Sequence, residues 1–261
     1  MSTTIGSSAY NNSIYSNYSN KPAQRMASAK RINSAGDDAA MAAMAEKLQA
    51  LINGLDKGTD NSYDMQNLLK TAEGGMSAIS DSLQRIRELS LKSQNGIYTD
   101  ADKELIQHEV NQLLEHIDFT VSATQFNGKN LLDGGANNLH TASDAHGNGM
   151  NVSIGSVSSS SLGIAGLDIT GAFDLSKIDK ALEQLGSVRS LIGASVNRLD
   201  HTIDHTQRAS VHQAEALSRI IDTDYAKESI SYNTNRLLEQ YRNFSLKSQL
   251  NSMGNQAHML L

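Results

Sequence analysis

A hydrophobic pattern with a period of 3.5 residues runs without a slip through residues 44–90. Its positions alternate in steps of four and three: Met44, Leu48, Leu51, Leu55, Gly58, Ser62, Met65, Leu69, Ala72, Met76, Ile79, Leu83, Ile86 and Ser90. Because this period keeps one face of a helix against a neighbour, the pattern predicts a long helix packed on another long helix. At ~1.5 Å per residue, a helix over residues 38–93 would be roughly 80 Å long.

Two further segments show helical spacing. The first is predicted to start at Thr99 or Asp100 and to run to about Ala123, as an antiparallel neighbour of the long helix because the connecting loop is short. In the second, a heptad pattern runs from Asp174 to Ile220 and turns polar in its middle third. Polar core positions fix the register of paired helices, so this part is expected to set how the two long helices align.

The chain ends differ from these helices. Residues 1–24 are rich in Ser, Asn and Tyr, and Pro22 is expected to interrupt a helix there, so we expect a segment that is disordered in the monomer. Its thin apolar stripe would be Tyr10, Ile14 and Tyr18. By contrast, residues 225–261 are too apolar along one side to be stable alone in water.

The middle of the chain changes period. Asn127-Gly128 and Asp133-Gly134 are strong tight-turn dipeptides, and short alternating pieces such as residues 150–154 predict one or two small β-hairpins within residues 136–173. The run SVSSSSLG over residues 156–163 is expected to be an exposed loop.

Charge and composition exclude several classes of function. The formal charge of −6 and the absence of any basic run argue against nucleic-acid binding. The chain has no Cys, so it can form neither a disulfide nor a thiolate metal site. No segment has the run of about 18 or more apolar residues that a membrane-spanning helix needs. The first residues lack the apolar core of a secretory signal.

The fold predicted from these patterns is all-α: an elongated antiparallel coiled-coil or helical bundle with a small β-hairpin portion in the middle. The boundaries we expect are residues 1–30 for the N-terminal segment, 31–125 and 174–222 for the two halves of the bundle, 126–173 for the central region, and 223–261 for the C-terminal helix.

Four motifs in this order resemble those of bacterial flagellin. They are RINSAGDDAA (residues 31–40), TAEGGMSAISDSLQRIRELS (71–90), TQFNGKNLL (124–132) and IIDTDYAKES (220–229), and the chain also shares the MLL ending with Leu260 and Leu261. The resemblance implies a secreted, extracellular subunit that polymerises with itself into the flagellar filament. It also implies export without a cleaved signal through the flagellar type III apparatus, an export chaperone, and cap and junction proteins as partners.

Two features depart from the family pattern. MASAK stands where the family usually carries LSSG, after a polar, Tyr-rich stretch that replaces an amphipathic one. The central region is also short, so the outer domains of large flagellins are expected to be absent. The alternatives are therefore a flagellin-like receptor ligand or adhesin that does not polymerise, and a junction protein between hook and filament.

One surface is a candidate for recognition. Gln84, Arg85, Glu88 and Leu89 fall off the heptad seam and are expected on or beside one exposed face, where a solvated helix would be the plainest interpretation. The resemblance implies recognition by the host Toll-like receptor for flagellin through Arg85, Leu89 and Glu109, with Glu109 on the neighbouring helix.

Other residues are expected to be structural. We hypothesise that Arg31, Asn33 and Asp37 form a polar junction near the start of the first long helix, with Asn33 or Ser34 as its cap. Asp222 and Asp224 are expected to cap the last helix. The ring of Tyr225 is expected to pack back on the bundle.

No enzyme site is expected. His201 and His205 have the spacing of two metal ligands on a helix, but Thr202 stands where the H-E-x-x-H motif of zinc proteases has its Glu. We interpret the pair as part of a solvent face and predict no catalytic residue, no cofactor and no metal.

Overall fold

The structure is a computed structural model and describes residues 20–171 and 173–258. It forms two compact units. Residues 51–211 make the central unit, and residues 1–50 and 212–261 make the terminal unit.

Helix α2 (Ala39–Ser93) is 55 residues long and contributes to both units. In the central unit, every seam position from Leu55 to Ser90 is buried, as predicted. The seam ends sooner than expected at the other end of the helix, because Leu48 is half-buried and Met44 is exposed. The helix ends at Ser93, immediately before Gln94-Asn95-Gly96, where the turn residues had predicted the end.

The cap of α2 differs from the prediction. The helix begins later than Asn33 or Ser34 would place it, and the Asp38 carboxylate accepts a hydrogen bond from the backbone N–H of Met41 at 3.0 Å. Asp38 is therefore the N-cap, because it satisfies one of the free donors of the first turn.

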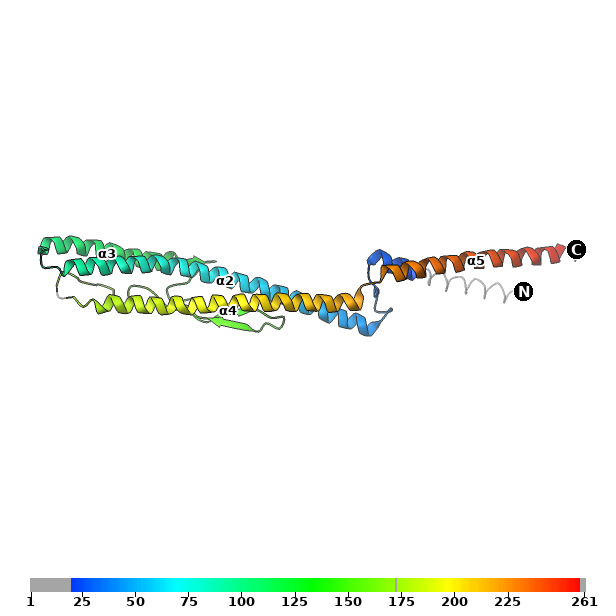
Figure 1. Ribbon diagram of the computed structural model, residues 1–261, viewed down its shortest axis with the longest axis horizontal. Coiled ribbons are helices and arrows are strands. Elements are labelled where there is room, and N and C mark those ends of the chain that lie inside the picture. The colour runs from blue at the N-terminus through cyan, green and yellow to red at the C-terminus, as the bar shows by residue number, and fades with distance from the viewer. Residues whose placement is uncertain (1–19, 172, 259–261) are drawn as a thin grey trace. The chain divides into compact units, whose positions relative to one another are not determined.

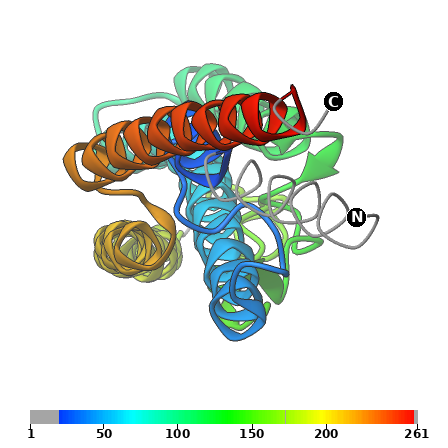
Figure 2. The ribbon, with the colours of Figure 1, turned by 90° about the vertical axis from the view of Figure 1, so that its right-hand side faces the viewer.

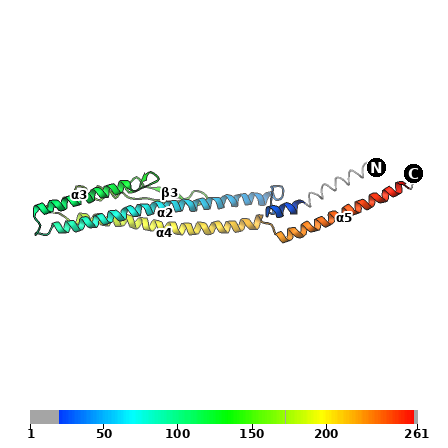
Figure 3. The same ribbon diagram turned by 90° about the horizontal axis from the view of Figure 1, so that it is seen from above.

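Helix α3 (Asp100–Ala123) starts and ends where the sequence predicts. Thr99 caps it in a capping box: its hydroxyl accepts from the Asp102 backbone N–H, and the Asp102 carboxylate accepts from the Thr99 backbone N–H. The short connection brings α3 back beside α2 (Figures 1 and 3).

Helix α4 (Ser176–Ile221) runs antiparallel to α2 in the central unit. Arg87, near the end of α2, pairs with Asp179 in the first turn of α4, whereas Asp56 accepts from Ser210 near the other end. Both side views show the two helices lying alongside each other (Figures 1 and 3). The predicted pairing of two long helices is thus confirmed for this unit.

The middle segment forms two hairpins. Strands β1 (Gln125–Phe126) and β2 (Lys129–Asn130) flank Asn127 and Gly128, which both have positive φ and make the predicted tight turn. Strands β3 (Leu139–Ala142) and β4 (Gly149–Val152) pair antiparallel, with Leu139 opposite Val152. Residues 167–169, which also alternate apolar and polar side chains in the sequence, do not form a strand.

The serine-rich run is not simply an exposed loop. Val157 and Leu162 are buried in the core, and Ser159 donates hydrogen bonds from its backbone N–H and its hydroxyl to the carboxylate of Asp118 on α3. The expectation was wrong because Val157, Ser159 and Leu162 are buried and Ser156 and Ser158 are half-buried. Ser160, Ser161 and Gly163 are the exposed residues of the run.

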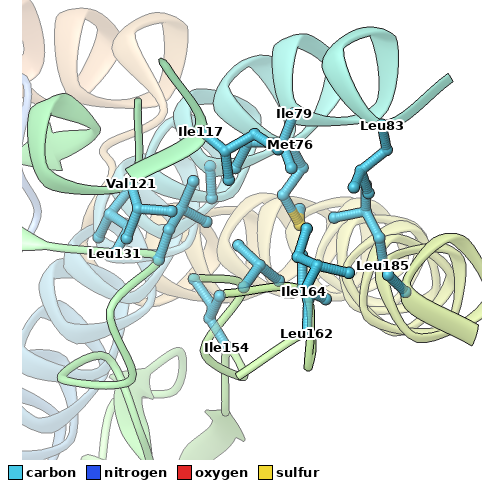
Figure 4. Packing of buried hydrophobic residues seen from close by; sticks show 14 of the residues in the cluster. Met76, Ile79, Leu83, Ile117, Val121, Leu131, Ile154, Leu162, Ile164 and Leu185 are labelled. Atoms are coloured by element: carbon cyan, nitrogen blue, oxygen red, sulfur yellow. The ribbon is translucent and has the colours of Figure 1, made fainter. Parts of the chain in front are cut away.

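One hydrophobic core joins all parts of the central unit. Side chains from α2, α3, the middle segment and α4 meet in it, as Figure 4 shows for Met76, Ile117, Ile154, Ile164 and Leu185. The view along the helices shows the middle segment running beside α2 (Figure 2). The middle segment therefore forms a fourth side of this core, beside the three helices α2, α3 and α4.

The terminal unit contains the helical residues 20–28, the C-terminal part of α4, and α5 (Tyr225–His258). Residues 20–24 differ from the disorder expected for residues 1–24, because the helix continues through Pro22 to Ser28 and ends at Ala29, which has φ 55°. The stripe of Tyr10, Ile14 and Tyr18 lies outside the described residues.

The predicted class, all-α with a small β portion, is confirmed: the described residues form long helices and two two-stranded sheets. Within the described part of the chain, no helix has the length and apolar character needed to cross a membrane.

Candidate functional site

Asp37 is the centre of a polar loop in the terminal unit. Its carboxylate accepts hydrogen bonds from the backbone N–H groups of Asn33 and Ser34, both at 3.2 Å, and from the Lys21 amine at 3.2 Å. The Lys21 hydrogen bond, followed by that of Asn33, holds the pKa of the Asp37 carboxyl below its ordinary value. The loop before α2 is thus tied to the helical residues 20–28.

Arg31 lies on the other side of the same loop. Its backbone N–H donates to the Ile221 carbonyl and its Nη2 donates to the Ile220 carbonyl, both at 2.6 Å. Arg31 therefore binds the last carbonyls of α4, which lack helical partners. The three residues hypothesised as one junction lie in one loop, but Arg31 and Asp37 bind different helices.

The two aspartates before α5 divide their roles. Asp224 is the N-cap of α5, since its Oδ1 accepts from the backbone N–H groups of Ala226 and Lys227, both at 3.1 Å. Asp222 was expected to cap α5 but does not. It ends α4, where its backbone N–H donates to the Ser218 carbonyl and its carboxylate accepts from the Ser218 hydroxyl.

Tyr225 does not pack back on the bundle: 64% of it is exposed. It is the first residue of α5. Leu260 and Leu261 lie outside the described residues.

The candidate recognition face lies across α2 and α3. Arg85 donates from Nε and Nη2 to Oε1 of Glu109, at 3.0 and 2.8 Å, and from Nη1 to Glu88 at 3.2 Å. These three side chains and Gln84 are exposed. The structure brings Arg85 and Glu109 together, as expected for residues on antiparallel neighbours.

The expectation that Leu89 lies on this exposed face is wrong, because only 2% of the Leu89 surface is exposed. The heptad seam describes contact with one neighbour, whereas α2 packs on both α3 and α4, so its buried face is wider than the seam. Leu89 lies beneath the polar face rather than in it.

Polar pairs across α2 and α4 form a second feature, in which Arg189 and Thr206 stand at heptad positions of the C-terminal pattern. The Thr59 and Thr206 hydroxyls lie 2.9 Å apart and are buried. Gln66 donates to Asp200 at 2.6 Å, and Arg189 donates twice to one carboxylate oxygen of Glu73, at 2.9 and 2.7 Å. The heptad pattern does not single out the other members of these pairs, because Thr59, Gln66, Glu73 and Asp200 lie beside the heptad positions.

Gln107 was missed altogether. Its side-chain amide donates to the Leu167 carbonyl at 2.7 Å and accepts from the Ile169 N–H at 2.8 Å, so it pairs with the backbone as a strand would. No sequence signal marks an exposed-looking Gln on a helix for this role. The contact anchors the middle segment to α3.

His201 and His205 are exposed, which agrees with the solvent-face interpretation. Among the described residues, no group of three or more His, Cys, Asp or Glu side chains is arranged to hold a metal ion.

Comparisons with known proteins agree with the sequence motifs. Residues 1–137 match the family model described as the bacterial flagellin N-terminal helical region, and residues 175–261 match the bacterial flagellin C-terminal helical region.

Individual relatives match over most of their length. A flagellin of Halalkalibacterium halodurans is 36% identical over 237 residues, which cover 88% of this chain and 87% of the relative. The flagellar filament core protein flaB2 of Brachyspira hyodysenteriae is 37% identical over 257 residues, 90% of each. A crystal structure of Bacillus cereus flagellin has 28% identity and a TM-score of 0.48, covering 56% of this chain and 88% of that one.

The two family models together span both helical parts and leave out only the middle segment from residue 138 to residue 174. The chain belongs to the bacterial flagellin family, which is a family of structural proteins and not of enzymes.

Proposed function

We propose that this chain is a subunit that self-assembles into the extracellular flagellar filament and that α5 is buried between copies when it does so. The observation that carries the proposal is the exposed apolar surface of α5. Eight large apolar side chains are exposed in the described part of α5: Tyr225, Ile230, Leu237, Leu238, Tyr241, Phe244, Leu246 and Leu250.

The spacing on α5 suits a helical partner. Leu237, Tyr241 and Phe244 follow one another in steps of four and three, which is the spacing of a coiled-coil seam. Each large apolar side chain that becomes buried contributes roughly 1.5–3 kcal/mol. Eight such side chains on one helix supply a strong drive for association and leave the free helix poorly stable in water.

The same surface bears on export and partners. A helix with this much exposed apolar area aggregates unless it is covered, so a flagellar export chaperone that holds α5 before assembly fits the chain. Secretion through the flagellar apparatus, and contact with cap and junction proteins at the filament ends, complete the proposal.

The test is a set of substitutions that keep α5 helical. The variant with Leu237→Gln, Tyr241→Gln and Phe244→Gln removes the apolar seam, and Lys247→Gln is the control on an exposed polar position of the same helix. In ammonium sulfate, which favours burial, the wild type and the control are expected to sediment as filaments visible by negative-stain microscopy, and the triple variant is expected to stay monomeric. Filaments of the triple variant would contradict the proposal. A monomeric wild type would favour the soluble receptor-ligand alternative.

A second function, as a ligand of the host Toll-like receptor for flagellin, is favoured by the pairing of Arg85 with Glu109. The pair holds an Arg in a fixed position on an exposed face, and a preorganised Arg is a frequent anchor of protein interfaces. Gln84 and Glu88 extend this face, and Leu89 supports it from below.

Receptor-expressing reporter cells separate these roles. Arg85→Ala and Glu109→Ala are each expected to lower the potency of the monomer about tenfold, which corresponds to about 1.4 kcal/mol. Arg208→Ala, an exposed position on α4, is the control. Leu89→Ala is expected to lower the free energy of unfolding in addition to the potency, because Leu89 is buried. Unchanged potency of both Arg85→Ala and Glu109→Ala would exclude this face as the receptor-binding surface.

A further inference from the structure

A cavity of 720 Å³ in the terminal unit is rich in basic side chains. The helical residues 20–28, the end of α4 and the start of α5 all line it. Five basic and three acidic side chains face it, so it has an excess of two positive charges. The basic side chains are Lys21, Arg25, Arg31, Arg219 and Lys227.

The three acidic side chains of the lining already have partners. Asp222 accepts from the Ser218 hydroxyl, and Asp224 accepts from two backbone N–H groups at the start of α5. Glu228 pairs with Arg25 at 3.1 Å. None of these carboxylates is bound by the other basic side chains of the cavity within the described residues.

Three of the basic side chains keep their charge uncompensated. The Arg31 guanidinium donates to the Ile220 carbonyl, which is neutral. Arg219 and Lys227 are exposed and have no carboxylate partner among residues 20–171 and 173–258. These charges repel one another when the cavity holds only water.

A buried hydroxyl points to the same cavity. Thr223 lines it, and its Oγ1 is buried without a hydrogen-bond partner among the described residues. Its backbone N–H is already used, because it donates to the Ala29 carbonyl. A buried hydroxyl without a partner costs about 1–3 kcal/mol, so a ligand oxygen within its reach would remove that cost.

We propose that this cavity binds a doubly charged oxyanion, namely a phosphate or sulfate group. Its negative charge is opposite in sign to the excess positive charge of the lining, in which Lys21 is already paired with Asp37. Arg31 and Arg219 offer guanidinium N–H groups in the fork that suits oxyanions, Lys227 adds a point charge, and the Thr223 hydroxyl donates to one oxygen. The bound group would link the three segments that line the cavity.

Isothermal titration calorimetry of the full chain, kept monomeric and at constant ionic strength with chloride, tests the proposal with inorganic phosphate and with sulfate. Saturable binding is expected for the wild type. The Arg219→Gln, Lys227→Gln double variant is expected to raise the Kd at least fivefold, and Thr223→Val at least twofold. Arg198→Gln, on α4 but outside the cavity, is the matched control and is expected to bind like the wild type.

The proposal is overturned if the wild type shows no saturable binding, or if the double variant binds as tightly as the wild type. Far-UV circular dichroism of each variant keeps loss of folding separate from loss of binding. A parallel titration with glycerol phosphate distinguishes the source of the group: tighter binding than inorganic phosphate assigns the site to a phosphate ester, and weaker binding assigns it to the free ion.

Discussion

The hydroxyl oxygens of Thr59 on α2 and Thr206 on α4 lie 2.9 Å apart in the buried interface of the two helices. Each hydroxyl also lies within hydrogen-bond distance of a carbonyl of its own helix. The pair is flanked by Asp56 with Ser210 and by Gln66 with Asp200. A shift of one helix by a single turn would break all three contacts, so they fix the register of α2 against α4.

Replacing the threonines by valine tests this register contact. Thr59→Val alone is expected to lower the unfolding free energy by about 1 kcal/mol, because the Thr206 hydroxyl loses its partner on the other helix. Thr206→Val should act similarly, and the double variant should cost less than the sum of the two. Urea unfolding of all four proteins gives the coupling; strictly additive effects would show that the two hydroxyls do not interact.

Gly58 gives a sharper test, because the chain holds a matched control on the same helix. A Cβ at Gly58 would lie 2.4 Å from the Ser143 carbonyl oxygen, whereas a Cβ at Gly74 would meet nothing within 4 Å. Gly58→Ala is therefore expected to destabilise the central unit by about 1–3 kcal/mol. Gly74→Ala is expected to stabilise it by about 0.5–1 kcal/mol, since Ala favours a helix.

Thermal unfolding of both glycine variants decides between these effects. Equal changes in Tm would mean that the β3–β4 connection does not rest on α2 at Gly58. The helix weakness that four glycines suggest from sequence is thus only part of their role: Gly58 lets a backbone segment approach closely, and Gly74 does not.

The periodic parts of the fold were predictable, and the contacts between unlike segments were not. The seam from Leu55 to Ser90 and the start of α3 at Thr99 follow from local spacing and capping chemistry. Burial of Leu89 depends on a second neighbour of α2, which a heptad pattern cannot show.

The candidate sites follow the same division. Asp224 is a local cap and was predicted, whereas Asp222 ends α4, where its carboxylate accepts from the Ser218 hydroxyl instead of capping α5. The basic cavity needs three segments to meet, among them residues separated by nearly the whole chain, such as Arg25 and Glu228. Sequence spacing contains no signal for such a meeting.

Gln107 allows a test of how the middle segment is held. Gln107→Leu leaves the Leu167 carbonyl and the Ile169 N–H without their partner, at a cost of roughly 1–3 kcal/mol. Hydrogen exchange at the Ile169 amide is expected to accelerate at least tenfold. Asn111→Ala, which removes a contact of Gln107 but leaves both backbone hydrogen bonds in place, is the control. Unchanged exchange at Ile169 in Gln107→Leu would contradict the anchoring role.

The β3–β4 hairpin is expected to respond to pH through His140. Its Nδ1 lies 2.8 Å from the Asn151 side-chain oxygen and its Nε2 lies 3.2 Å from the Gly147 carbonyl oxygen. Both oxygens accept, so only the protonated ring donates to both. The hydrogen bond to Asn151, followed by that to Gly147, raises the pKa of His140 above its ordinary value.

The sign follows from linkage. Because the folded pKa is above the unfolded one, this stabilisation is fully present below the unfolded pKa and is lost as the pH rises through the folded pKa. NMR titration should place the His140 pKa above its ordinary value in the wild type and closer to that value in Asn151→Ala. A His140 pKa that is the same in both proteins would contradict the assigned hydrogen bond.

Hydrogen exchange of α5 in the monomer and in the assembled state tests whether this helix is buried on assembly. Amides of residues 237–250 are expected to exchange rapidly in the monomer, because the surrounding apolar side chains are exposed, and to become protected by at least a hundredfold in filaments. Amides of the α2 seam between Leu69 and Ile86 should be protected in both states. Filaments in which α5 still exchanges rapidly would contradict burial of this helix as the basis of assembly.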